Sequence, residues 1–249
     1  MITLITVTYN AIDTLERTLR SVERQTYRKV QHIIKDGGSK DGTVALAEAY
    51  QKRNPEADII VVSERDKGLY DAMNTALGMA TGDYVCFLNA GDKLHAPDTL
   101  QRLVEAIPEG VEAGVVYGDT DIVDDDGKFI RKRRLSPPEH LRSGSFRNGM
   151  MVCHQAFYAN RKLVPMYDTR YRFSADFDWC VKIMKESEKL GLPMVNTHLV
   201  LADYLSEGMT TRNHKASLHE RFSIMVKHWG WVSTLAYHAW FIVRGWVKK

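Results

Sequence analysis

The sequence predicts an α/β protein in which a mostly parallel sheet is flanked by helices and followed by a helical C-terminal tail. The main observation is that short β-branched runs alternate with helical patterns over the first hundred residues. Four such βα steps imply right-handed crossovers, which place helices on both faces of a parallel sheet. The second observation is composition. The 249 residues are 44% hydrophobic and 26% charged, which allows a substantial core and excludes a disordered or fibrous chain.

The individual elements follow from the spacing of the apolar residues. Strands are expected over residues 2–8, 30–35, 58–62, 83–88 and 113–117. Helices are expected over residues 12–22, 44–53, 71–80, 100–107 and 175–190, with one or two more in the last thirty residues.

Residues 124–127, with the sequence Asp-Asp-Asp-Gly, interrupt this regularity and predict a hairpin with an Asp-Gly turn. A calcium-binding loop is the alternative, but its spacing would need a ligand at Ile122. The basic run at residues 131–134 is expected to be a solvated edge or loop, with an anion-binding site as the alternative.

Charge and cysteine content exclude several classes of protein. The net charge of +3 gives no sign of a nucleic-acid partner, although residues 218–249 combine five basic residues with one acid. Cys86, Cys153 and Cys180 are far apart, which argues against a disulfide framework or a zinc ribbon. No basic segment precedes the apolar N-terminus and no stretch reaches roughly 18 apolar residues, so neither a signal peptide nor a spanning helix is expected. These features favour the cytoplasm.

The candidate chemistry lies where the predicted strands end, because an open parallel sheet binds ligands at the carboxyl ends of its strands. Thr8-Tyr9-Asn10 follows the first strand, and the absence of G-x-G-x-x-G and G-x-x-x-x-G-K-[ST] argues against a dinucleotide site and a P-loop. Asp36 and a glycine-rich loop follow the second strand. Its carboxylate can accept a hydrogen bond from a nucleobase, whereas a plain strand-to-helix loop is the alternative.

The third and fourth strand ends carry further polar residues. Lys67 can contact a phosphate and Asp71 can cap the next helix, although surface charge around a cap is the simpler interpretation. Residues 89–92 read Asn-Ala-Gly-Asp. Asp92 can supply a hard oxygen ligand to Mg²⁺ or Mn²⁺, which can bridge the oxygens of a diphosphate.

Taken in order, these four strand ends resemble the inverting glycosyltransferases of family 2, of the bacterial polysaccharide-biosynthesis type, which have the GT-A fold. The matching segments are residues 5–10, 36–43, 66–74 and 82–92, and the likeness is strongest over residues 1–100. Beyond them, residues 154–156, 174–179 and 207–210 are also similar to the family.

The resemblance implies transfer of a sugar, of hexosyl type, from a nucleoside diphosphate sugar to a hydroxyl acceptor with inversion. Thr8, Tyr9 and Asp36 would hold the base and ribose, and Asp92 would hold the metal. The expected donor-binding set is Thr8, Tyr9, Asn10, Asp36, Lys67, Asn74, Asn89 and Asp92. The acceptor would be a saccharide or a lipid-linked saccharide.

The expected organisation is a GT-A catalytic domain over residues 1–212, followed by an amphipathic helical segment over residues 213–249. Within the domain, residues 1–118 would form a Rossmann-like nucleotide-sugar half, and residues 119–212 would form the acceptor and catalytic half.

Asp176 is the expected general base. A carboxylate at the start of a helix can take the proton of the acceptor, and a single displacement needs only one base. The alternative role for Asp176 is to cap the N-terminus of the helix. Asp178 points about 200° round the same helix and should matter less. Asp119 or Asp121 would be the next candidates.

The sequence departs from the family at the metal motif. Many relatives have D-x-D-D, whereas Asn89 and Gly91 here lack carboxylates, which puts the affinity or choice of nucleotide in doubt. His154 or His198 could be a second metal ligand, but a packed histidine is the more common role.

The tail predicts an amphipathic helix over residues 232–247, with an apolar arc of roughly 160°. Tyr237 and Phe241 interrupt its polar side. A helix lying on the inner face of the cytoplasmic membrane, a helix docked on the domain and a contact with a second copy are all open.

Two other functions are also considered. A sugar-1-phosphate nucleotidyltransferase would need a basic glycine-rich loop after the first strand, and a non-catalytic nucleotide-sugar binder would not need Asp176.

Overall fold

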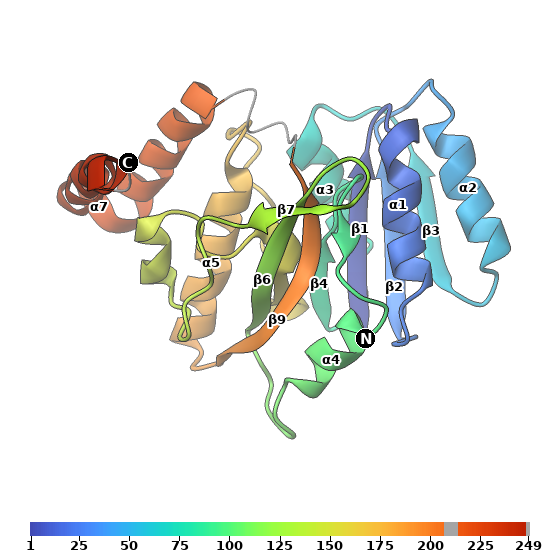
Figure 1. Ribbon diagram of the computed structural model, residues 1–249, viewed down its shortest axis with the longest axis horizontal. Helices are drawn as coiled ribbons and strands as arrows, with labels where there is room; N and C mark the ends of the chain where they lie inside the picture. Colours follow the sequence, from blue (N-terminus) through green and yellow to red (C-terminus); the bar gives the residue numbers. More distant parts are fainter. Residues whose placement is uncertain (207–213, 248–249) are drawn as a thin grey trace.

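The computed structural model describes residues 1–206 and 214–247, and a nine-stranded sheet organises this part of the chain (Figure 1). The strands are β1 (Ile2–Thr8), β2 (Val30–Asp36), β3 (Asp58–Ser63), β4 (Tyr84–Phe87), β5 (Lys93–Leu94), β6 (Val115–Val123), β7 (Phe129–Lys132), β8 (Phe157–Asn160) and β9 (Met194–Leu205). The α-helices are α1 (Ile12–Glu23), α2 (Thr43–Arg53), α3 (Leu69–Leu77), α4 (Thr99–Glu105), α5 (Ala175–Lys189) and α7 (His214–Val247). Short 3₁₀ helices are η1 (Ser143–Asn148), η2 (His154–Ala156) and η3 (Arg161–Leu163).

The first four predicted strands form the parallel half of the sheet, in the order β3-β2-β1-β4. All seven residues of β1 are buried, which is typical of a central strand covered on both faces. The register pairs Thr8 with Asp36 and Asp36 with Ser63, so these strand ends lie side by side. The predicted βα organisation of this half is confirmed.

Beyond β4 the sheet is mixed. β8 is antiparallel to both β4 and β6, β9 is parallel to β6, and β5 is antiparallel to β9. The strand expected at residues 113–117 is longer than predicted: β6 continues through register shifts to Val123, because β9 and β7 pair with its second half. Asp119 and Asp121 therefore lie within β6, and the boundary expected between residues 118 and 119 falls inside this strand.

Helices cover both faces of the sheet, as predicted (Figure 1). Two apolar clusters under α1, α2 and α4 include Leu19 and Leu100, whereas the larger cluster on the other face includes Met73 of α3 and Trp179 of α5. α3 begins at Leu69, two residues before the predicted start, and the Asp71 carboxylate in its first turn accepts the backbone N–H of Lys67 at 2.9 Å. Gly68, and not Asp71, occupies the N-cap position and no side chain of the described residues caps this helix, so the capping role considered for Asp71 is wrong.

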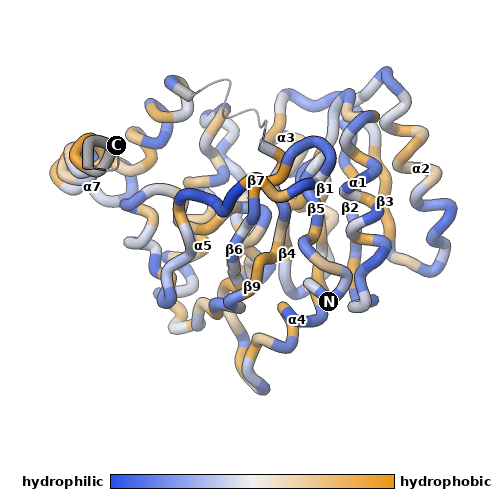
Figure 2. Tube along the Cα trace, viewed as in Figure 1, coloured by the Kyte–Doolittle hydropathy of each residue, from blue (hydrophilic) through white to orange (hydrophobic). Residues whose placement is uncertain are grey.

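The predicted hairpin joins β6 and β7. The Gly127 N–H donates to the Asp124 carbonyl at 2.9 Å, and Gly127 has φ +79°, a conformation that favours glycine. All four residues of β7 are exposed, which agrees with a solvated edge at the basic run. Figure 2 shows hydrophilic residues beside β7. From this run, Arg133 instead turns inward and donates to the carbonyls of Met150 and Met151.

α7 contains a kink at Gly230, where φ is 79° and ψ is 167°. We call residues 214–229 the first arm and residues 231–247 the second arm. The two-helix alternative for the tail is thus confirmed. Residues 207–210 and the expected boundary at 212/213 lie outside the described residues. The three cysteines are buried and form no disulfide.

Candidate active site

The ends of β1 and β4 bring together two of the predicted donor-binding residues. Thr8 is the last residue of β1, and Asn89 follows the neighbouring strand β4. Within the described part of the chain, the Thr8 Oγ1 and Asn89 Oδ1 atoms are buried and have no hydrogen-bond partner. Because an unsatisfied buried polar atom is costly, these two oxygens are suited to a polar or cationic ligand.

Asp36 organises the glycine-rich loop after β2. Its Oδ2 accepts the N–H groups of Gly38 and Ser39 at 2.8 Å each and the Ser63 hydroxyl at 2.7 Å, while the Ser39 hydroxyl donates to Oδ1. Burial by itself raises the pKa of Asp36, but these hydrogen bonds outweigh it and lower the pKa below its usual range. The loop therefore holds a charged carboxylate at the strand end.

Tyr9 and Asn10 form one wall of the same loop. The Asn10 N–H donates to Ser39 Oγ at 2.7 Å, and Asn10 Oδ1 accepts the Lys40 N–H at 3.0 Å. A Cβ at Gly37 would lie 3.3 Å from the Tyr9 ring, so glycine permits this close packing. The Tyr9 side chain is otherwise 66% exposed, which leaves an aromatic face beside Asp36.

A buried ion pair, absent from the sequence expectations, ties the third strand end to the second. Lys35 is fully buried, and its Nζ lies 2.7 Å from Asp66 Oδ1 and donates to the Asp36 and Glu64 carbonyls. The adjacent Lys67 is exposed. Its side chain is thus free to reach a phosphate near this loop, and that role stays a prediction.

Asn74 lies on α3, and its amide pairs with a distant backbone segment. Asn74 Nδ2 donates to the Tyr167 carbonyl at 3.0 Å, and the Tyr167 N–H donates to Asn74 Oδ1 at 2.7 Å. Tyr167 in turn stacks on Trp179 at 5.1 Å and on Tyr70 at 5.3 Å. In this arrangement Asn74 positions an aromatic cluster. The contact expected between Asn74 and the donor stays a prediction.

Asp92 is buried close to the end of β4. Its Oδ2 accepts Gln155 Nε2 at 2.7 Å, and its Oδ1 accepts the Leu205 N–H at 3.0 Å. Burial raises the pKa of Asp92 to about 7, because two neutral donors compensate only part of the lost hydration. Gln155 was missed as a site residue; its only sequence signal was the likeness of residues 154–156 to the family.

A divalent cation fits the residues around Asp92. The Asp92 carboxylate is hydrogen-bonded by two neutral donors, the charge of Arg17 lowers its pKa less than burial raises it, and the unpartnered Asn89 Oδ1 lies three residues before it. Carboxylate and amide oxygens are ligands that Mg²⁺ and Mn²⁺ accept. The two histidines considered as further ligands have other contacts: the buried His154 stacks on Phe87 at 5.3 Å, and the exposed His198 pairs with Glu139 at 3.4 Å.

A second group of possible metal ligands lies on β6, β9 and the residue after β5. One ligand atom from each of His95, Asp121 and Asp203 falls within 4.8 Å of the others. Asp203, however, already contacts His95 at 2.6 Å and Lys93 at 2.9 Å. Burial raises its pKa, but these cationic partners outweigh burial and lower it. A bound metal ion would therefore stabilise the Asp203 carboxylate less than the Asp92 carboxylate.

Asp176 lies in the first turn of α5 and is half-buried. Its Oδ1 accepts the Tyr70 hydroxyl at 3.3 Å and the Phe177 N–H at 2.9 Å. Burial raises the pKa of Tyr70 well above its usual value, so this hydroxyl remains a donor. The contact places the candidate base beside α3, which directly follows the Lys67 loop. Ser174, and not Asp176, occupies the N-cap position.

Asp178 points away from this site into a contact between α5 and α7. It is buried, and its carboxylate contacts His228 at 2.7 Å, Lys182 at 2.7 Å and Lys227 at 3.0 Å. Burial raises its pKa, but the hydrogen bonds from these three partners outweigh burial and hold the pKa well below its usual range. Asp178 is therefore a charged anchor between two helices.

Glu220 on the first arm of α7 fixes the segment before Asp176. Its carboxylate accepts the N–H groups of Arg172, Phe173 and Ser174 at 2.8, 2.8 and 2.9 Å. The sequence offered one weak signal, since Glu220 is the only acid in residues 218–249. Together with Asp178, it makes α7 part of the support for the candidate base.

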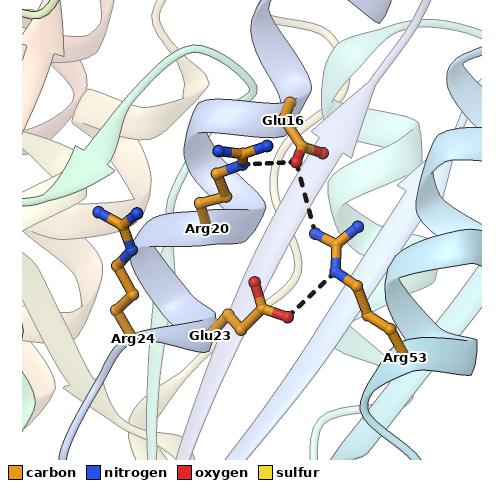
Figure 3. Close-up of a pocket in the computed structure, with 5 residues that line it drawn as sticks. All are labelled: Glu16, Arg20, Glu23, Arg24 and Arg53. Atoms are coloured by element: carbon orange, nitrogen blue, oxygen red, sulfur yellow. Dashed lines mark hydrogen bonds and ion pairs between the residues drawn. The ribbon is translucent and has the colours of Figure 1, made fainter.

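A surface hollow of about 320 Å³ lies between α1 and α2, away from these residues (Figure 3). Glu16 pairs with Arg20 at 2.6 Å and Arg53 at 3.6 Å, and Glu23 pairs with Arg53 at 3.0 Å. The lining residues are three residues of α1, Arg24 directly after it and Arg53, the last residue of α2. The hollow is therefore not the donor site that the strand ends predict.

Comparison with known proteins agrees with this architecture. A family model described as "Glycosyl transferase family 2" matches residues 3–164. The "PGL/p-HBAD biosynthesis glycosyltransferase" of Mycobacterium bovis (strain BCG / Pasteur 1173P2) is 32% identical over 211 residues, which cover 82% of this chain and 76% of the relative. The "Amylovoran biosynthesis glycosyltransferase AmsB" of Erwinia amylovora is 29% identical over 210 residues, covering 79% of this chain and 66% of that protein.

The fold is also similar to a solved structure, the mannosyltransferase PcManGT from Pyrobaculum calidifontis in complex with GDP-Man and Mn²⁺. The two superpose with a TM-score of 0.66 at 20% sequence identity, covering 91% of this chain and 63% of that chain. At this identity the likeness supports the fold alone, and it agrees with the predicted GT-A architecture.

Proposed function

The chain belongs to glycosyl transferase family 2, and from this premise we propose that it moves a sugar from a nucleoside diphosphate sugar to a hydroxyl acceptor with inversion. One observation carries the proposal for this chain. The Tyr70–Asp176 contact of 3.3 Å joins a candidate base to the donor-side loops across 106 residues of sequence. The printed names of the two relatives, PGL/p-HBAD and amylovoran biosynthesis, support a role in cell-surface glycan synthesis.

The donor would lie along the strand ends. The exposed ring of Tyr9 offers a face for the base, and the charged Asp36 offers an acceptor for its N–H groups. Thr8 and Asn10 would complete the base and ribose contacts, and Lys67 would approach the diphosphate. Asn89 and Asp92 would hold Mg²⁺ or Mn²⁺, which, when bound, neutralises charge on the departing diphosphate.

The acceptor step follows from the position of Asp176. Its carboxylate can take the proton of the acceptor hydroxyl as that oxygen attacks the anomeric carbon. One carbon–oxygen bond forms while the bond from the anomeric carbon to the diphosphate breaks, so attack opposite the leaving group inverts the anomeric centre. Tyr70 and Glu220 keep the carboxylate in place from two other helices.

A donor assay tests the proposal. The protein is incubated with Mn²⁺ and a panel of nucleoside diphosphate sugars, and the release of nucleoside diphosphate is measured. A transferase releases nucleoside diphosphate, because its slow hydrolysis of the donor uses water as the acceptor. Release of pyrophosphate from a nucleoside triphosphate and a sugar phosphate would instead identify a nucleotidyltransferase. Tight binding without any turnover would indicate a non-catalytic binder.

Replacing Asp36 by alanine should weaken nucleoside diphosphate binding by about 10- to 150-fold. A hydrogen bond to a charged acceptor contributes about 1.5–3 kcal/mol, which corresponds to this range of affinity. Isothermal titration calorimetry with the preferred nucleotide gives the dissociation constant. Asp41→Ala is the matched control, because Asp41 lies in the same loop but accepts the Thr43 N–H at the start of α2 at 3.1 Å. Equal losses for both variants would mean that loop order alone is being measured.

Replacing Asp92 by asparagine should remove the dependence of donor binding on Mn²⁺ while the protein stays folded. The change deletes a buried charge that two neutral donors compensate only in part, and it keeps the side-chain volume. Donor affinity is measured with and without Mn²⁺. Asp121→Asn is the control, because Asp121 belongs to the second group of possible ligands. If Asp121→Asn loses the metal dependence and Asp92→Asn keeps it, the metal is assigned to the wrong residues.

A further inference from the structure

The second arm of α7 packs on the domain with the side that its sequence makes least apolar. Thr234 is fully buried, and the rings of Tyr237 and Phe241 pack against the large core cluster. The His238 ring lies 4.9 Å from that of Phe222 on the first arm. These four residues recur at helical spacing, so one side of the arm is already occupied by protein.

The opposite side of the second arm is apolar and exposed. Trp231, Val232, Leu235, Trp240, Ile242 and Val243 have exposed fractions between 50% and 85%, and Ala236 and Ala239 are exposed between them. At about 100° per residue these eight residues fall within an arc of about 180°. We call this set the outer face. Figure 2 shows hydrophobic residues along this part of α7.

A contiguous apolar face of this kind marks a surface that binds a partner, and nothing in the described part of the chain covers it. The charge that follows this face in the sequence distinguishes between partners. Residues 244–249 contain three basic residues and no acid, whereas Lys227 of the first arm is already paired with Asp178. A two-fold contact between two copies would bring these like charges together, whereas an anionic lipid surface would neutralise them.

We propose that the outer face of α7 docks the protein on an anionic lipid bilayer, with the second arm lying in the membrane interface. Tryptophan is favoured at that depth, since its ring is apolar and its indole N–H remains close to water. Among the described residues, no helix is long and apolar enough to cross a bilayer. The arm therefore lies on the surface, as amphipathic helices with a basic flank do.

Docking would orient the enzyme through the first arm. Glu220 holds the segment before Asp176, and Asp178 contacts Lys227 and His228 of the same arm. The first arm, which continues into the bilayer-bound second arm, thus contacts the helix that carries the candidate base directly. This inference depends on the tail alone and would stand if the proposed sugar transfer were wrong.

Sedimentation with vesicles tests the proposal on the full chain. We expect binding to vesicles containing phosphatidylglycerol, weaker binding to pure phosphatidylcholine, and a decrease at high salt as the basic residues are screened. The double substitution Leu235→Glu and Val243→Glu should lower vesicle binding by about tenfold or more, because both side chains would enter the lipid. Point changes are preferable to truncation, which would remove Tyr237 and Phe241 from the core.

The matched control is the double substitution Met166→Glu and Leu190→Glu. These two side chains are as exposed as the outer face, at 56% and 55%, and the pair adds the same charge elsewhere. It should keep vesicle binding within about threefold. Equal loss in both double variants, or wild-type binding to neither kind of vesicle, would overturn the proposal. So would a dimer in light scattering that only the α7 variant abolishes and that vesicles do not compete with.

A measurement on the unmodified chain guards against misfolded variants. Vesicles of phosphatidylglycerol with brominated acyl chains should quench the tryptophan fluorescence if Trp231 and Trp240 enter the interface. Trp240→Phe, which keeps an apolar ring, should bind vesicles with little change and show less quenching. Unchanged quenching in Trp240→Phe, together with unchanged emission of the wild type on adding lipid, would contradict docking through this face.

Discussion

Replacing Asp176 by asparagine is expected to slow sugar transfer by about 10²- to 10⁴-fold, which is the usual contribution of a general base. This corresponds to about 3–5 kcal/mol of transition-state stabilisation. Asparagine keeps an oxygen that can accept from the Tyr70 hydroxyl and the Phe177 N–H, so the start of α5 should hold its shape. Donor affinity should therefore stay within about threefold of the wild type. Steady-state rates at saturating donor and acceptor, with calorimetric donor affinities, measure both effects.

Tyr70→Phe is the informative companion to this variant. It removes the hydroxyl that donates to Asp176 but leaves the carboxylate, so a smaller loss of about tenfold is expected, with donor affinity unchanged. If Asp176→Asn transfers sugar at the wild-type rate, the base lies elsewhere. An inactive Asp178→Asn protein that retains wild-type stability, beside an active Asp176→Asn, would mean that the wrong carboxylate of α5 was chosen.

Replacing Asp178 by asparagine should destabilise the fold by about 3 kcal/mol, because it leaves Lys182, Lys227 and His228 without their buried carboxylate partner. The value is at the lower end of the range for a broken buried pair, since Lys182 and Lys227 are about one third exposed. For a chain of this size the melting temperature should fall by about 6–12 °C. Differential scanning calorimetry measures the shift, and per folded molecule the variant should remain active.

Glu186→Gln is the control for this stability effect. Glu186 lies on the same helix and pairs with Lys189 at 2.9 Å, but both side chains are exposed. Exposed pairs contribute about 0–1 kcal/mol, so the melting temperature should change little. A loss of similar size in both variants would mean that the charge of the helix, and not the buried contact with α7, sets the stability.

The stability of the Asp178 contact should also depend on pH in one direction. Its folded-state pKa is lowered below the unfolded value of about 4, so the folded state favours the charged carboxylate. The stabilisation is therefore complete above about pH 4 and is lost as the pH falls below it. The difference in unfolding free energy between the wild type and Asp178→Asn should be full at pH 7 and shrink below pH 4. A difference that grows on acidification would contradict this assignment.

The sequence by itself determined the parallel half of the sheet and the places where chemistry can occur. β-Branched runs and helical spacing are local patterns, and β1 to β4 appeared where those patterns predicted them. The strand-end residues followed from the same reasoning, because the register that sets Thr8 beside Asp36 is a general property of consecutive βα units. Asp92 and Asp176 were candidates because carboxylates at a strand end and at a helix start have a limited set of roles.

Only the tertiary structure decided how these candidates are held and which surfaces remain free. Asp92 is fixed by Gln155 and Leu205, which lie 63 and 113 residues away, and its raised pKa follows from burial that no local pattern encodes. The mixed half of the sheet depends on which strands pair with one another. The alternation of side chains along a strand does not specify its partner. For the second arm of α7, periodicity predicted an apolar side but not its environment. Long-range packing of Tyr237 and Phe241 turned that side outward, because a helix can bury only the side that the rest of the fold can cover.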